Sequence, residues 1–155
     1  MNEATGRMDI NAFSQAVGLT PEQAVVQVHS LADFGFLKKV GSGYCLTDKG
    51  KNAFKIEEQA PPEKTFTFYE GLDQPLGVSA RSIEEFYAAI KTVSWDSLTF
   101  HLYRGDFEKW VEEVWHDKEL ASEIDELEGY GLNEEDLRKA LLKAIDNRYG
   151  VGDLL

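Results

Sequence analysis

The residues best suited to chemistry are His101, Arg104 and Asp106, with Ser97 one helical turn before the histidine. An imidazole oriented by a carboxylate is the arrangement of a general base. A nucleophile would also need a hydroxyl–imidazole hydrogen bond, which the spacing of Ser97 and His101 alone does not establish. We therefore interpret the four residues as a polar site of unassigned role. In this interpretation His101 is a satisfied buried polar group, Asp106 caps a helix and Arg104 pairs with an acidic neighbouring helix.

Metal and cofactor chemistry has little support in the sequence. Cys45 is the single cysteine, which excludes an internal disulfide and a cysteine-based zinc site. His101, Asp106, His116 and Asp117 lack the HxH or HExxH spacing of metal ligands. The glycines at 41–43 lack the lysine and helix start of a phosphate-binding loop. We expect no metal, no cofactor, no catalytic residue and no enzymatic activity.

A second candidate chemistry is phosphate binding by lysines. The chain has 28 acidic and 16 basic residues, a formal net charge of -12. The charge is uneven, because residues 1–60 hold six basic and seven acidic residues, whereas residues 61–155 hold ten and twenty-one. One stretch has a single acidic residue, Asp48, among five lysines: Lys38, Lys39, Lys49, Lys51 and Lys55. Such a local patch can contact a nucleic-acid backbone even in an acidic chain.

The lysines lie on elements with clear sequence signals. Thr20 and Pro21 begin a helix, since a hydroxyl N-cap accepts free amide hydrogens and proline fits the first helical position. Gly35 ends that helix. Two short β-like runs flank the Gly41-Ser42-Gly43 turn and predict a hairpin over residues 36–46. Thr47 then caps a further helix that begins at Asp48.

This helix, hairpin and capped helix resemble the winged helix-turn-helix domains of the MarR and ArsR families of small prokaryotic regulators. The matching residues are Phe13 to Val17, Gly18-Leu19-Thr20, the helix to Phe34, Gly35-Phe36-Leu37, Tyr44 and Leu46 to Gly50. The resemblance covers about the first third of the chain and implies a nucleic-acid-binding regulator. The candidate nucleic-acid-binding residues are Gln23, Gln27, Lys38, Lys39, Ser42, Lys49 and Lys51.

The outward face of the helix after Thr20 weakens that implication. It offers Gln27 for adenine but no Arg or Lys, and Glu22 and Asp33 would oppose phosphates. The fold can instead serve as a protein-binding or packing module. The alternative function is therefore an interaction adaptor that acts on a basic protein or ribonucleoprotein, or on the transcription machinery, without reading sequence.

The beginning of the chain lacks the first helix of a winged-helix domain. We expect a short strand at Met8-Asp9-Ile10 and a helix from Ala12 to Val17 capped by Asn11. Without a first helix the back of the domain would expose apolar surface, which is uncommon on monomers. Our hypothesis is that the C-terminal helices, or a second copy of the chain in a homodimer, cover it.

The second half begins after a charged, proline-containing linker, with the boundary near Pro61. A strand over 65–69, a loop over 71–77 and a return strand over 78–80 form a short hairpin. Capping residues then predict successive helices after Ser82, Ser94, Asp106, Asp117 and Asn133. The segment 95–103 also alternates like a strand, but helix is favoured. We expect residues 151–155 to be a frayed tail.

This half resembles a small uncharacterised domain found in archaea and bacteria. The resemblance depends on Gly77, Ala80, Ser82, Phe86, Ser97, Phe100-His101, Arg104, Asp106-Phe107 and Trp110. It implies no function.

The sequence as a whole predicts an α+β, mainly helical protein. Residues 1–60 form a winged helix-turn-helix and residues 61–155 form an acidic, mostly helical domain with a short β-hairpin. The expected partner is nucleic acid, with DNA favoured, or a basic protein or ribonucleoprotein. No apolar run approaches the ~18 residues that span a bilayer. The N-terminus lacks a basic-then-apolar signal pattern, so we expect a cytoplasmic protein.

Overall fold

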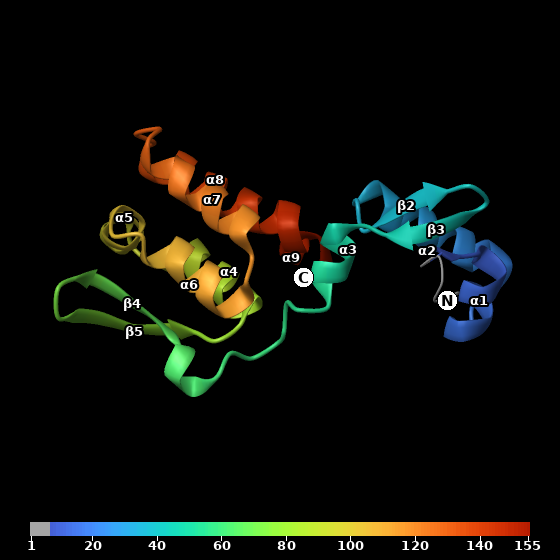
Figure 1. Ribbon diagram of the computed structural model, residues 1–155, viewed down its shortest axis with the longest axis horizontal. Helices are drawn as coiled ribbons and strands as arrows, with labels where there is room; N and C mark the ends of the chain where they lie inside the picture. The colour runs from blue at the N-terminus through green and yellow to red at the C-terminus, as the bar shows by residue number, and fades with distance from the viewer. Residues whose placement is uncertain (1–6) are drawn as a thin grey trace.

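The computed structural model describes residues 7–155. The molecule is elongated, and its two parts lie end to end along the long axis (Figure 1). We call residues 7–55 the head and residues 56–155 the body. The fold is α+β and mainly helical, with one small antiparallel sheet in each part. Residues 1–6 lie outside the described residues. They include most of the N-terminal segment for which no signal peptide was expected.

The head alternates short strands and helices around one antiparallel sheet in the order β1-β3-β2. Its hairpin register places Lys39 opposite Tyr44 and Lys38 opposite Cys45. The elements are β1 (Arg7–Met8), α1 (Ile10–Val17), α2 (Pro21–Asp33), β2 (Leu37–Val40), β3 (Gly43–Leu46) and α3 (Asp48–Ala53).

Local hydrogen bonds explain where these helices begin. Thr20 Oγ1 accepts the amide hydrogen of Gln23, and the Gln23 side chain accepts that of Thr20, a reciprocal capping box. Thr47 caps α3 as predicted, because its Oγ1 accepts the Gly50 amide hydrogen. The predicted Asn11 cap is wrong. The Asp9 carboxylate accepts the Ala12 amide hydrogen at 2.7 Å, so α1 begins at Ile10 and the preceding strand ends at Met8.

The body is a helical assembly against a two-stranded antiparallel sheet (Figure 1). Helix is confirmed for residues 95–103, whose first turn is capped by Ser94. The elements are η1 (Pro62–Lys64), β4 (Phe66–Gly71), β5 (Gln74–Ala80), α4 (Ile83–Thr92), α5 (Trp95–Tyr103), α6 (Asp106–Trp115), α7 (Lys118–Glu128), α8 (Glu134–Tyr149) and α9 (Val151–Leu154).

Two expectations about the body are wrong. The loop predicted over 71–77 is mostly strand, because Leu72 and Asp73 alone make the turn and Asp73 takes the positive φ of 58° that a tight hairpin needs. The tail predicted to fray is the short helix α9. Val151 is fully buried there, and the Asp146 carboxylate accepts the Gly152 amide hydrogen.

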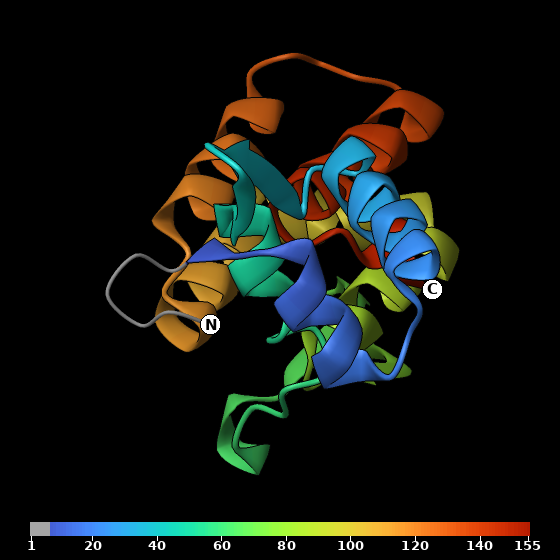
Figure 2. The same cartoon turned by 90° about the vertical axis from the view of Figure 1, so that its right-hand side faces the viewer.

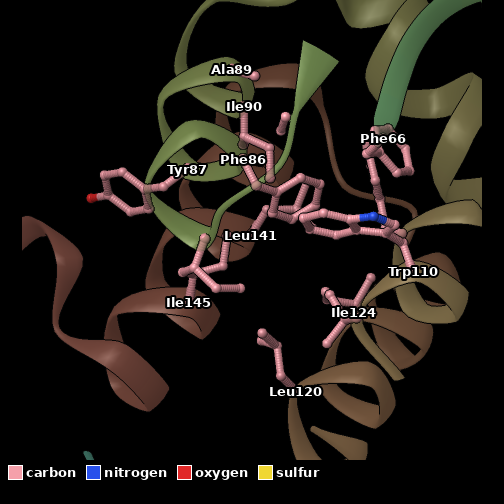
Figure 3. Close-up of a cluster of buried hydrophobic side chains, with 14 of the residues drawn as sticks. Phe66, Phe86, Tyr87, Ala89, Ile90, Trp110, Leu120, Ile124, Leu141 and Ile145 are labelled. Atoms are coloured by element: carbon pink, nitrogen blue, oxygen red, sulfur yellow. The ribbon is translucent and has the colours of Figure 1, made fainter. Parts of the chain in front are cut away.

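Aromatic rings fill the centre of the body core (Figure 3). Phe86 lies among Phe66, Phe107 and Trp110, with ring centroids 5.0–5.7 Å apart. Aliphatic side chains of α7 and α8 close the other side of this core, among them Leu120, Ile124, Leu141 and Ile145. Burying side chains of this size provides most of the favourable free energy of folding for a small domain.

The head joins the body through α3, which packs against α8 (Figure 1). The Asn52 side chain donates to the Arg148 carbonyl oxygen at 3.0 Å. Phe36 is buried, and its ring lies against Gly150 at the end of α8. Beyond α3 the segment predicted to be a spacer is held to the body, since Ile56 and Ala60 belong to the body core.

Candidate interaction surface

His101 links the sheet of the body to two of its helices. It is 3% exposed, and its Nε2 accepts the backbone amide hydrogen of Tyr69 at 2.8 Å. Its Nδ1 lies 2.8 Å from Asp106 Oδ2 and donates to it, since Nε2 must be the acceptor. The interpretation of His101 as a satisfied buried polar group is confirmed.

The electrostatics of His101 follow from this burial. Desolvation lowers the pKa of the imidazole, and the hydrogen bond and charge of Asp106 oppose that shift only in part. The side chain is therefore held neutral with both nitrogens occupied. An imidazole in that state has no free lone pair with which to take a proton from a substrate.

The other members of this polar site do not complete a catalytic arrangement. Asp106 is the first residue of α6 rather than its cap, which is Gly105, and it also accepts from Arg104 at 3.2 Å. Ser97 is fully buried, and its hydroxyl has no hydrogen-bond partner among residues 7–155. The structure brings His101, Arg104 and Asp106 together and leaves Ser97 apart.

The hairpin of β2 and β3 extends away from the body (Figure 1). Lys38, Lys39 and Ser42 are exposed on it, and neither lysine forms an ion pair with any described residue. Because successive side chains of a strand alternate between its faces, Lys38 and Lys39 lie on opposite sides of the sheet.

The remaining candidate nucleic-acid-binding residues differ in availability. Gln27 and Lys51 are exposed, on α2 and α3. Gln23 is already engaged in the capping box of α2. Lys49 bridges the two parts: its Nζ donates to Asp153 of the body at 2.8 Å and to the Phe34 carbonyl oxygen within the head at 2.6 Å. Of the three lysines on α3 and its end, Lys49 is thus withdrawn from any outside partner.

An apolar groove lies in the head, and the buried Phe36 is not among its lining residues. The groove has a volume of about 280 Å³. Figure 2 looks onto the end of the head, with α1, α2 and the sheet towards the viewer. Asp9 is the single charged residue that lines the groove, and that carboxylate caps α1. The apolar lining comprises Met8, Ile10, Phe13, Val28, Leu31, Leu37, Tyr44, Leu46 and Phe54.

The body does not cover this groove. Every residue that lines it belongs to the head, and the C-terminal helices contact the head on the side of α3 and Phe36. The hypothesis that those helices cover the back of the head is therefore wrong. Phe54, at the rim, is 79% exposed.

An apolar surface on the head was expected from the sequence, but no residues were assigned to it. Phe54 could have been identified as an exposed apolar residue, because it directly follows a short helix and has Lys51 and Lys55 close to it in the sequence. The partners of Phe54 come from strands and helices more than seven residues away, and a sequence pattern does not place them.

Comparison with known proteins identifies the body alone. Residues 63–153 match the model of a family described as a family of unknown function (DUF5752). No curated protein and no solved structure matches the chain. Within the described residues, no helix combines the length and apolar composition needed to cross a bilayer. Nor do His, Cys, Asp and Glu residues gather there in a group of three that could hold a metal ion.

Proposed function

The chain belongs to the DUF5752 family of unknown function, whose model matches residues of the body. We propose that the protein acts by binding another protein through its head. The observation that carries this proposal is the open apolar groove lined by α1, α2, the sheet and Phe54. Contiguous exposed apolar surface is uncommon on monomeric proteins and marks interaction sites.

In this proposal the head is a winged helix-turn-helix, with α1 and α2 as the paired helices and the β2–β3 hairpin as the wing. The order of its elements and the β1-β3-β2 sheet support the assignment. Among the described residues, 7–155, only the short strand β1 precedes α1. In this proposal an element of a partner packs on the open groove.

The body serves as the rigid support of the head. Ile56 and Ala60 enter its core, and the Lys49–Asp153 ion pair ties α3 to α9. These contacts leave the groove and the wing facing outward. A partner that binds the groove is therefore held in a defined orientation to the acidic surface of the body.

The experiment is capture from a native, nuclease-treated lysate with two variants of matched exposure. Phe54→Asp places a charge at the groove, whereas Leu72→Asp places one on the hairpin of the body, where Leu72 is 74% exposed. We expect the Phe54→Asp variant to lose a specific partner that the wild type and Leu72→Asp retain. Equal capture by all three proteins would refute the proposal.

A second candidate function is nucleic-acid backbone binding through the wing. It is favoured by the exposure of Lys38 and Lys39 and by their lack of ion pairs with described residues. Against it, the outward face of α2 holds Glu22 and Asp33. Two or three phosphate contacts would give weak binding whose affinity falls steeply with salt.

The test of this second function is a charge reversal. Lys38→Glu combined with Lys39→Glu should abolish retention of duplex DNA at low salt while leaving the melting temperature nearly unchanged, because exposed charges contribute only about 0–1 kcal/mol to stability. Retention that survives the double reversal would rule out the wing as the contact surface.

A further inference from the structure

We propose that the groove of the head accepts an amphipathic helix with acidic flanks, supplied by the partner protein. This inference rests on the proposed function and adds the chemistry of the partner. Two features carry it: the lack of polar groups inside the groove, and the lysines around its rim.

The interior of the groove selects a helix over an extended segment. Its lining is almost entirely apolar side chain, and its one carboxylate, Asp9, is already used to cap α1. An extended segment would bring backbone N–H and C=O groups into this interior without partners. A helix satisfies its own backbone hydrogen bonds and presents apolar side chains at i, i+3, i+4 and i+7, which is the established way to fill such a groove.

The sheet side of the rim is basic. Leu37 lines the groove, and Lys39, two residues further along β2, lies on the same face of the strand. The register places Lys39 beside Tyr44, which also lines the groove. Lys39 is exposed and forms no ion pair with any residue from 7 to 155.

The α3 side of the rim is basic as well. Phe54 lines the groove, and Lys51 lies one turn before it on the same face of the chain. Lys55 follows Phe54 directly. Both lysines are exposed and, within the part of the chain that the structure describes, carry no ion pair. Lys39 thus lies on the groove face of the sheet, and Lys51 and Lys55 lie within one helical turn of Phe54 in the sequence.

This pattern of charge argues against the other occupants. A second copy docked groove to groove would bring two sets of lysines together, and like charges placed close to each other oppose association. Nucleic acid could contact the lysines, but its charged backbone would leave the apolar interior unfilled. A helix with a leucine stripe and glutamate flanks matches both the interior and the rim.

The test uses the full-length protein and three synthetic helical peptides as probes. They share one leucine stripe and differ only in their flanking residues, which are glutamate, glutamine or lysine. Binding is followed by fluorescence anisotropy of labelled peptide. We expect the glutamate peptide to bind roughly tenfold more tightly than the lysine peptide, as two or three exposed charge pairs would give.

Two variants test the placement of the site. Phe54→Asp should abolish binding of the glutamate peptide, whereas Leu72→Asp should leave its affinity unchanged. Lys39→Glu combined with Lys51→Glu should invert the order, so that the lysine peptide binds more tightly than the glutamate peptide. These positions are exposed, and circular dichroism verifies that each variant is folded.

Three results would overturn the inference. They are equal affinity for the three peptides, an order that the double charge reversal leaves unchanged, and no glutamate-peptide binding while duplex DNA binds through Lys39 and Lys51. If the glutamate peptide fails but lysate capture still depends on Phe54, the inference falls and the proposed function stands. If capture is also independent of Phe54, both fall.

Discussion

The head and the body differ in how far they bury their apolar side chains. The body buries a continuous aromatic and aliphatic core in which Phe68, Phe86 and Phe107 are fully inaccessible. The head buries only Ala24, Val28 and Phe36 among its apolar residues. The shorter head leaves as many of its larger apolar side chains substantially exposed as the longer body does: Val17, Val26, Phe34, Val40 and Phe54.

This difference associates stability with the body and binding with the head. The body completes its own core and coincides with the part of the chain that defines the family. The head depends on the body for the burial of Phe36 and still leaves its groove open. An element that stays incomplete on its own is suited to recognition, because a partner gains free energy by burying what the chain leaves exposed.

The largest expected effect is the loss of an aromatic ring from the body. Phe86→Ala should lower the free energy of unfolding by about 3–5 kcal/mol, since Phe86 is fully buried among other rings. Val28→Ala in the head should cost only about 1–2 kcal/mol, because fewer methyl groups are lost beside an open groove. Urea unfolding of both variants measures the two costs. Equal losses would remove the contrast between the two parts.

An intermediate effect is expected at the joint between them. Gly150 has φ of 71°, and a Cβ there would lie 2.3 Å from Phe36 Cζ and 2.9 Å from Lys49 Cε. Gly150→Ala should therefore combine a left-handed backbone cost of about 1–2 kcal/mol with a clash that separates the head from the body.

Gly18→Ala is the matched control for this substitution. Gly18 also ends a helix, with φ of 68°, and nothing lies within 4 Å of its added Cβ. Gly18→Ala should carry the backbone cost alone, without a change in molecular dimensions. Calorimetry and small-angle scattering compare the two variants. A radius of gyration that Gly150→Ala leaves unchanged would show that Phe36 can yield without undocking.

The smallest expected effect is the titration of His101 in the body. Burial lowers the pKa of His101 in the folded state, so the unfolded chain binds more protons in the interval below its ordinary pKa of about 6.5. The contribution of His101 to stability is thus complete above that pH and declines as pH falls towards the folded-state pKa. An NMR titration of the imidazole in the native protein measures the shift. A folded-state pKa above the ordinary value would contradict the neutral, doubly hydrogen-bonded state.

The sequence determined the local elements of this protein. Thr20, Thr47, Ser94 and Asn133 each accept an amide hydrogen from the residue three positions later. Such bonds lie within one helical turn, so the residue types alone predict them. The same local logic located the β2–β3 hairpin. It failed for Asn11, because Asp9 was an equally good cap two residues earlier.

Only the tertiary structure decided which residues are available for function. Lys49 appeared equivalent to Lys51 in sequence, but its partner Asp153 lies 104 residues away. The sequence predicted that His101 is satisfied but not by which group, since the Tyr69 amide hydrogen that it accepts comes from β4, 32 residues away. The groove is likewise assembled from residues between Met8 and Phe54. Contacts at such separations depend on how whole elements pack, which hydrophobic periodicity and capping do not specify.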